Sequence, residues 1–311
     1  MNFKITTGQQ ASIGLTWFRQ VRMSGLYALL IAVAACNSEP AKQGESGTEE
    51  KQDSGQDEKI AKVQKVFYSV PSPVQAASLL KKAGAQYSKE ILNPASNVSK
   101  YTTGIAKAVN LGVYGTDLAY TNMFNQTQEA ITYLNAVHKL ANELGMGGAT
   151  QNAEVSVRFQ NNLGNQDSLI AIISDIFRES DDYLKENQQY NSATLVLVGG
   201  WVEGLYIATK QAKKNPSPEI TTRIAEQKFS LGNLLALLSD YQAEDADLIK
   251  DLTDIKKSYD ALSTERTEKA STTDSATKVT SINTVTKVVM TTGQLTEISG
   301  KIDALRTKLT K

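Results

Sequence analysis

Cysteine and histidine are almost missing from this chain of 311 residues, and each scarcity removes a class of chemistry. Cys36 is the single cysteine, so the chain cannot form an internal disulfide bond. His138 is the single histidine, which makes zinc motifs with two histidines impossible. No glutamate stands three residues after it, so the di-iron helix pattern is missing too. We therefore expect no metal site, and we interpret His138 as an ordinary core or surface residue.

An excess of basic charge is missing as well. The chain has 33 basic and 33 acidic residues, whereas nucleic-acid-binding proteins usually have a basic patch and a high pI. No glycine-rich loop follows a predicted strand, so the nucleotide-binding fingerprints are absent, and no serine lies in a nucleophile-elbow motif. We expect neither a nucleic-acid partner nor a bound cofactor, and the sequence assigns no catalytic residue.

What the N-terminal sequence does contain is an apolar run at residues 26–35 that ends just before Cys36. Three basic residues and no acidic residue lie among residues 1–35, and the run is shorter than the ~20 residues of a membrane-spanning helix. This pattern is typical of a bacterial lipoprotein signal peptide, cleaved before a cysteine that receives lipid. The alternative is a short membrane anchor, or a buried helix that ends in cysteine. Cleavage would leave 33 less 3, or 30, basic residues against 33 acidic ones.

Residues 36–59 are predicted to be the lipidated cysteine followed by an acidic tether. Residues 37–59 contain seven acidic residues, three lysines, and no aromatic or large aliphatic residue. Such a segment buries too little apolar surface to offset its ordering entropy. A random coil of this length reaches about 25–30 Å, enough to hold a domain clear of lipid head groups. With lipid on Cys36, no thiol nucleophile remains.

Helical periodicity dominates residues 60–262, which we expect to form the folded domain. Ser72 before Pro73 and Ser217 before Pro218 are typical helix starts. Helices are expected at residues 60–68, from 73, and at 97–124, 125–144, 153–163, 166–187, 192–214, 219–241 and 243–262. Residues 192–214 are the most apolar and therefore central. These features predict an all-α fold, a multi-helix array in which short loops make neighbouring helices mostly antiparallel.

The C-terminal part changes character. Residues 263–281 are rich in Ser, Thr, Lys and Glu and are interpreted as a polar linker or a helix extension. Residues 282–311 place large apolar residues mostly three, four and seven positions apart, which predicts a long amphipathic helix. Its many threonines and valines lower the helix propensity, so tertiary packing must hold it.

Two glycine-rich stretches, 110–120 and 199–206, are the strongest candidates for a site. Glycine within a helix costs about 1 kcal/mol relative to alanine, so a close helix approach is expected there. The polar and aromatic residues of the two stretches are Asn110, Tyr114, Asp117, Tyr120, Trp201, Glu203 and Tyr206. If the helices face each other, the two carboxyl groups are buried together and one has a raised pKa, as in many functional sites. The alternative is purely structural packing, with each carboxylate hydrogen-bonded to a Tyr, Asn or Arg.

A short Asp-Ser-apolar pattern, typical of O-glycosylation in some envelope proteins of Bacteroidota, occurs at Ser168 and at Ser275. Ser275 lies in the polar stretch and is the better candidate.

Several segments together resemble a group of uncharacterised lipoproteins from Bacteroidota. They are residues 69–73, 79–81, 84–85, 91–94 and 110–120, and the similarity extends over about residues 66–262. The resemblance implies an envelope location and a helical fold, and it implies no catalytic residue.

The sequence thus favours a non-enzymatic lipoprotein, held in the envelope at the outer membrane by lipid on Cys36, whose helical domain binds a partner protein or a small ligand. One alternative is a hydrolase of an envelope polymer that uses Asp117 and Glu203, which would have to line an open cleft with carboxyl groups ~5–9.5 Å apart. The second alternative is a structural spacer without a pocket.

Overall fold

The computed structural model describes residues 70–146, 153–239, 246–268, 272–274, 279–281 and 284–311. Its helices are α2 (Pro73–Lys82), α3 (Gly104–Met123), α4 (Thr127–Glu143), α6 (Ala153–Asn161), α7 (Gln166–Glu186), α8 (Tyr190–Lys214), α9 (Pro218–Leu238), α10 (Ala246–Asp260) and α11 (Thr292–Leu309), with two short 3-10 helices at Lys89–Ile91 and Ala95–Lys100. The fold is all-α, as predicted. The predicted signal peptide, the predicted tether and the helix expected at residues 60–68 lie outside the described residues.

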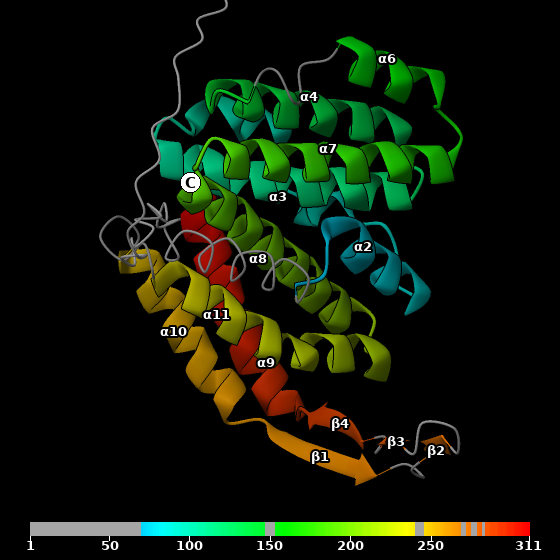
Figure 1. Ribbon diagram of the computed structural model, residues 1–311, viewed down its shortest axis with the longest axis vertical. Helices are drawn as coiled ribbons and strands as arrows, with labels where there is room; N and C mark the ends of the chain where they lie inside the picture. The colour runs from blue at the N-terminus through cyan, green and yellow to red at the C-terminus, as the bar shows by residue number, and fades with distance from the viewer. Residues whose placement is uncertain (1–69, 147–152, 240–245, 269–271, 275–278, 282–283) are drawn as a thin grey trace, which may run out of the picture. The chain divides into compact units, whose positions relative to one another are not determined.

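Helices α3 and α8 form the centre of the helical array (Figure 1). Helices α4 and α7 pack on α3, helices α9 and α11 pack on α8, and α10 contacts α9 and α11. Helix α2 contacts both central helices. Helix α8 is, among the described residues, the one helix long and apolar enough to cross a membrane, but most of its apolar window is buried inside the array. This burial is what the central helix of such an array requires.

Local sequence signals set the helix ends. The Ser72 hydroxyl accepts a hydrogen bond from the backbone N–H of Gln75, whose side chain accepts one from Ser72 in return, so α2 begins with a capping box and Pro73 in its first turn. The Ser217 hydroxyl caps α9 by accepting a hydrogen bond from the Ile220 N–H, and Pro218 stands at the first position of the helix. Gly145, just after α4, has a φ of +82°, which suits a helix C-terminus.

The helix predicted from residue 97 is shorter than expected. Residues Ala95–Lys100 form a 3-10 helix, and α3 starts only at Gly104, because the Thr103 hydroxyl accepts a hydrogen bond from the Ala106 N–H and fixes the helix start there.

The interpretation of residues 263–281 as a linker or helix extension is wrong, and so is the expectation of helix from residue 282. Strands β1 (Ser263–Glu268) and β4 (Thr284–Val289) pair antiparallel, with Ser263 opposite Val289, and β2 (Thr272–Asp274) pairs with β3 (Val279–Ser281). The β-branched residues of β4 fit a pleated ribbon better than a helix. The C-terminal helix, α11, begins at Thr292 behind a capping box made by Thr291 and Gln294.

Candidate functional site

The contact between α3 and α8 depends on two glycines. A Cβ atom on Gly112 would lie 2.0 Å from the backbone oxygen of Val196, and one on Gly199 would lie 1.9 Å from that of Val109. No side chain fits at these distances, so the two backbones meet only because both positions lack a Cβ. The expected close approach of the glycine-rich helices is confirmed.

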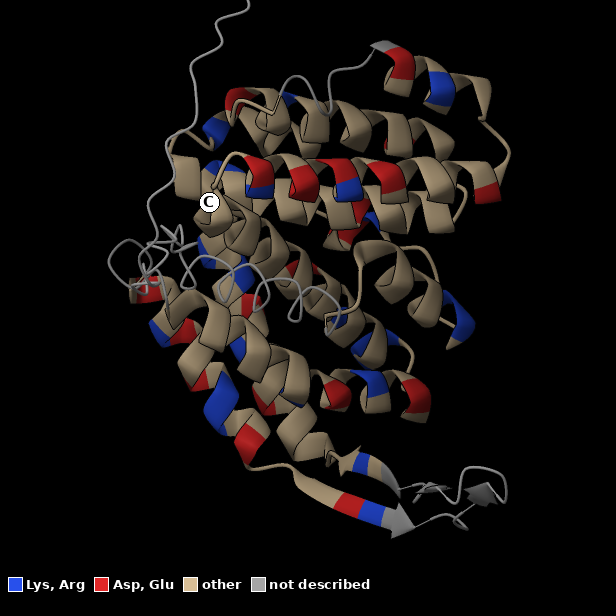
Figure 2. Cartoon of the chain, viewed as in Figure 1, with Lys and Arg blue, Asp and Glu red and all other residues tan. Residues whose placement is uncertain are grey.

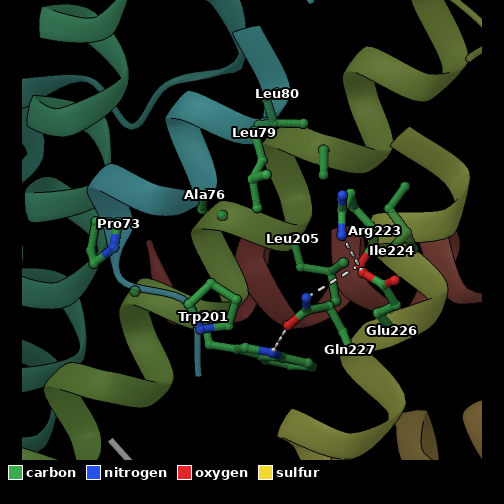
Figure 3. Close-up of a pocket in the computed structure, with 14 residues that line it drawn as sticks. Pro73, Ala76, Leu79, Leu80, Trp201, Leu205, Arg223, Ile224, Glu226 and Gln227 are labelled. Atoms are coloured by element: carbon green, nitrogen blue, oxygen red, sulfur yellow. Dashed lines mark hydrogen bonds and ion pairs between the residues drawn. The ribbon is translucent and has the colours of Figure 1, made fainter. Parts of the chain in front are cut away.

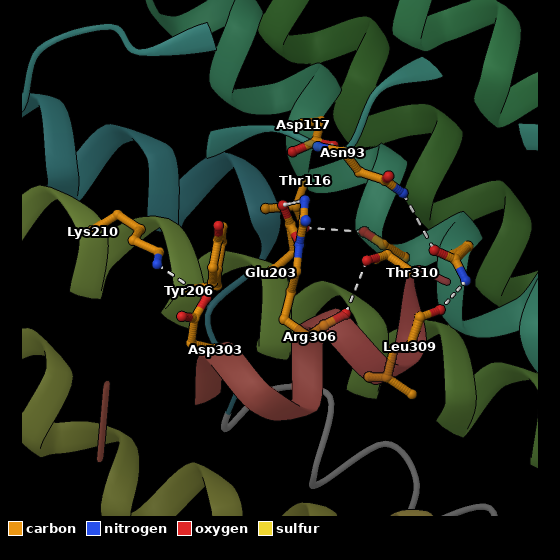
Figure 4. A network of polar contacts seen from close by, with 12 residues as sticks. Asn93, Thr116, Asp117, Glu203, Tyr206, Lys210, Asp303, Arg306, Leu309 and Thr310 are labelled. Atoms are coloured by element: carbon orange, nitrogen blue, oxygen red, sulfur yellow. Dashed lines mark hydrogen bonds and ion pairs between the residues drawn. The ribbon is translucent and has the colours of Figure 1, made fainter. Parts of the chain in front are cut away.

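This approach buries the two predicted carboxyl groups. Asp117 and Glu203 are both 0% exposed. Glu203 binds Arg306 of α11 through two bonds, from Nε to Oε2 and from Nη2 to Oε1, each 3.0 Å long (Figure 4). Asp117 Oδ2 accepts a hydrogen bond of 3.1 Å from the backbone N–H of Asn93. The bidentate pair of Arg306 and Glu203 is among the strongest kinds of hydrogen-bonded ion pair in proteins.

The charges of this cluster balance only if Asp117 is protonated. Burial, and then the negative charge of Glu203, raise the pKa of Asp117 well above its usual value, against the opposing effect of Arg306. Burial also raises the pKa of Glu203, but the charge and hydrogen bonds of Arg306 oppose this shift. Asp117 Oδ1 has no N–H or O–H donor among the described residues. The carboxyl groups of Asp117 and Glu203 share a hydrogen bond. Two carboxyl groups can bond in this way only if one of them carries a proton, and we place that proton on Asp117.

The same cluster secures the C-terminal end of α11. The Asn110 amide donates to the backbone oxygen of Leu309 at 2.8 Å, and the Tyr101 hydroxyl donates to that of Thr310 at 3.4 Å. Asn93, fully buried, donates to the Tyr101 hydroxyl at 2.9 Å. The last carbonyls of a helix have no partner within it, so these side chains supply the partners that α11 lacks.

Tyr206 borders the cluster on the α8 side. The guanidinium of Arg306 lies 4.6 Å and the ammonium of Lys210 lies 4.9 Å from the centre of its ring, both within cation–π distance. Lys210 also pairs with Asp303 of α11 at 3.0 Å. These contacts add a second attachment between α8 and α11.

Tyr114 and Tyr120 lie on α3 but serve other contacts. The Tyr114 hydroxyl donates to the backbone oxygen of Pro94 at 3.0 Å, and the Tyr120 hydroxyl donates to that of Gln86 at 3.0 Å. No hydrogen bond joins either hydroxyl to Asp117 in the described part of the chain. Burial raises the pKa of both phenols, that of Tyr120 to about 12.

Trp201 points away from the carboxyl cluster into an apolar hollow of about 210 Å³. The hollow lies between α2, α8 and α9 (Figure 3). Its walls are mostly apolar, from Pro73, Ala76, Leu79, Leu80, Trp201, Leu205 and Ile224, with Arg223, Glu226 and Gln227 at its edge. The Trp201 indole N–H donates to Gln227 Oε1 at 3.0 Å, so the ring is held in one orientation.

The predicted site residues thus divide into three groups, one of which is Tyr114 and Tyr120 with their separate backbone contacts. Asn110, Asp117, Glu203 and Tyr206 share the cluster with Arg306, whereas Trp201 alone among the seven lines the hollow. Sequence reasoning missed Arg306. The signal was present, because Arg306 follows Ile298 and Ile302 at steps of four and therefore lies on the buried face of its helix.

The remaining candidate residues, Cys36, Ser275 and His138, add no further site among the described residues. Cys36 and Ser275 lie outside the described residues. His138 is half-buried, its Nε2 has no hydrogen-bond partner in the described part of the chain, and burial lowers its pKa. The described residues contain no group of three or more His, Cys, Asp or Glu that could hold a metal ion.

Comparisons with protein families, with curated proteins and with solved structures found no match to this chain. The resemblance to lipoproteins of Bacteroidota therefore stays a prediction.

Proposed function

We propose that the chain is a lipid-anchored envelope protein whose helical domain binds a small amphipathic ligand without catalysis. The observation that carries the binding proposal is the hollow over Trp201, where apolar walls from three helices meet a charged edge. The apolar run before Cys36 supports the anchor.

The buried carboxyl cluster is not the proposed site. Asp117 and Glu203 are both closed off from solvent, and their hydrogen bonds and charges are used within the protein. A glycosidase pair must reach a substrate and a water molecule in an open cleft. This pair therefore gives the hydrolase alternative no support.

The chemistry of the hollow indicates the class of ligand. The aliphatic side chains and Trp201 provide an apolar surface, which drives binding through desolvation. At the edge, Arg223 Nη1 pairs with Glu226 Oε2 at 2.9 Å, and Arg223 Nε has no hydrogen-bond partner among the described residues. A ligand with an apolar body and an anionic or carbonyl group at one end would fit both features.

Trp201 itself allows a direct test. The chain has two tryptophans, Trp17 and Trp201, and cleavage before Cys36 would remove Trp17. In a Cys36→Ser chain beginning at residue 36, energy transfer from tryptophan to the apolar anionic dye anilinonaphthalene sulfonate then reports on dye bound near Trp201. We expect saturable transfer, and we expect Ala76→Phe, which fills the hollow, to weaken binding by roughly tenfold, about 1.4 kcal/mol.

Lys82→Phe is the matched control, because Lys82 lies on the same helix, is exposed, and does not line the hollow. Equal binding to both variants would contradict a ligand site at Trp201.

The anchor needs its own measurement. The unchanged chain should sediment with membranes, and the Cys36→Ser variant should appear in the soluble fraction, since stable anchoring depends on the acyl chains. Membrane sedimentation of both would contradict lipid attachment at Cys36.

A further inference from the structure

The edge of the hollow over Trp201 contains one guanidinium and one carboxylate. Among the described residues, Arg223 is the one basic side chain that lines the hollow, and Glu226 is the one acidic side chain. Both lie in the N-terminal part of α9, where the charged residues of that helix gather between Glu219 and Lys228 (Figure 2). A single guanidinium at the rim of an apolar hollow suits a ligand head with one negative charge.

The Nε donor of Arg223 is not used within the described part of the chain. Nη1 donates to Glu226, whereas Nε has no hydrogen-bond partner among the described residues. Arg306 binds Glu203 through Nε and Nη2, and a planar carboxylate prefers such bidentate binding. The Arg223 side chain is 42% exposed, so it can turn its Nε edge towards the hollow while Nη1 keeps Glu226.

The contact between α2 and α8 limits the hollow at the end away from Arg223. Pro73 and Arg223 lie at opposite ends of the hollow (Figure 3). A Cβ atom on Gly200 would lie 3.8 Å from Cγ of Pro73, and one on Gly204 would lie 3.8 Å from Cβ of Ala76, so the two helices pack directly on each other. A second hollow, of about 510 Å³, lies between α7 and α8, and Pro73 and Gly200 line both hollows. Their contact therefore forms a wall between the two.

The volume of the first hollow limits the apolar part of a ligand. A cavity of about 150 Å³ can hold benzene, which has six carbon atoms. By the same ratio, a hollow of about 210 Å³ has room for roughly eight carbon atoms. Most of its apolar walls are aliphatic side chains, which adapt to a flexible hydrocarbon chain.

We propose that the ligand of this hollow is a medium-chain carboxylic acid of about eight carbon atoms, with its chain over Trp201 and its carboxylate on Nε and Nη2 of Arg223. The half-exposed Glu226 keeps Nη1, and water screens its charge from the carboxylate of the ligand. This inference rests on the ligand site proposed at Trp201 and adds the charge and the length of the ligand.

A series of straight-chain acids tests the length. The probes are butanoate, hexanoate, octanoate, decanoate and dodecanoate, each below its micelle concentration. They are added to the Cys36→Ser chain from residue 36, which retains every described residue, and binding is measured by calorimetry. The dissociation constant should fall roughly fourfold per added methylene until about eight carbon atoms are reached, and then level off. A constant gain through dodecanoate would overturn the size limit, because the chain would then extend past Pro73.

A change of the head group tests the charge. Octanoate should bind roughly tenfold more tightly than octanol or octylammonium, because only the carboxylate accepts two charge-assisted bonds from Arg223. Arg223→Gln should weaken octanoate binding by a similar factor and leave octanol binding unchanged. Arg223→Lys keeps the charge but not the bidentate geometry, so it should restore only part of the affinity. Lys213→Gln is the matched control, because Lys213 is exposed on α8 and does not line the hollow.

The failure of this inference and that of the ligand site can be told apart. If octanoate and octanol bind equally well, and Ala76→Phe weakens both, the ligand site stands and the carboxylate on Arg223 is overturned. If neither the dye nor octanoate responds to Ala76→Phe, the ligand site itself fails, and the inference fails with it.

Discussion

Asp117→Asn should stabilise the protein at neutral pH, although it alters a fully buried residue at the centre of the fold. An asparagine of the same shape can accept the hydrogen bond from the Asn93 N–H and donate one to Glu203, as protonated Asp117 does. The unchanged protein must take up a proton to fold at neutral pH, and the variant need not.

The magnitude follows from linkage. The pKa of Asp117 is raised in the folded state above its unfolded value of 3.8, first by burial and then by Glu203. Between these two pKa values the folded state binds more protons than the unfolded state, so stability falls as pH rises, by about 1.4 kcal/mol per pH unit. Below 3.8 this stability is fully present. As pH rises above 3.8 towards the raised pKa, the variant should therefore gain stability on the unchanged protein, by at most about 1.4 kcal/mol per pH unit.

Urea denaturation of both proteins at several pH values measures this difference. His138 is present in both, so its titration cancels from the comparison. Glu203→Gln is the contrasting variant, because it leaves Arg306, whose side chain is 12% exposed, without its partner charge. We expect a loss of about 3–5 kcal/mol, as for other broken buried pairs. A stability difference between Asp117→Asn and the unchanged protein that does not vary with pH would refute a protonated Asp117.

Three further predictions concern packing, capping and titration. Gly112→Ala and Gly199→Ala should each destabilise the protein by about 3 kcal/mol, because the new Cβ meets backbone, whereas Gly232→Ala, with nothing within 4 Å, should stabilise it by up to about 1 kcal/mol in the same thermal melts. Ser217→Ala removes the cap of α9 and should cost about 1 kcal/mol by urea denaturation, and an unchanged midpoint would show that the cap contributes nothing. Burial lowers the pKa of His138 from 6.5, so stability should fall as pH drops from 6.5 through that lowered pKa, and His138→Gln should lack this part of the pH profile.

The parts of the fold that were predictable from the sequence are those specified by neighbouring residues. Ser72 with Pro73 and Ser217 with Pro218 marked two helix starts, and the glycines at 112 and 199 marked the helix contact. Each of these signals acts within a few residues or depends on the absence of a side chain. The local sequence pattern is therefore sufficient to predict these helix starts and this helix contact.

The β1–β4 ribbon was not predictable in the same way. Residues 284–289 alternate threonine, valine and lysine, and short β-branched runs suit either a strand or a helix that packing holds. What decides between them is the pairing with residues 263–268, which lie about twenty positions earlier. That pairing depends on tertiary contacts rather than on the run itself.

The candidate site was predictable in part, for a related reason. Asp117 and Glu203 could be placed together because the glycines of their helices predict a close contact. The partner that balances their charge, Arg306, comes from α11, 103 positions after Glu203. Trp201 shares the glycine-rich stretch with Glu203 but sits on a different side of α8, and its hollow is completed by α2 and α9. Trp201 and Glu203 are close in sequence and were therefore assigned to one site, although they lie on different sides of α8.

The distance along the chain between Glu203 and Arg306 also sets an order of events during synthesis. A ribosome adding about 5–20 residues per second produces Arg306 roughly 5 to 20 s after Glu203, over the 103 intervening positions. Throughout that interval the carboxylate of Glu203 has no guanidinium to balance it and remains better solvated by water than by the core. We therefore expect α3 and α8 to form early, and the contact between them to close around Glu203 only once α11 can supply Arg306.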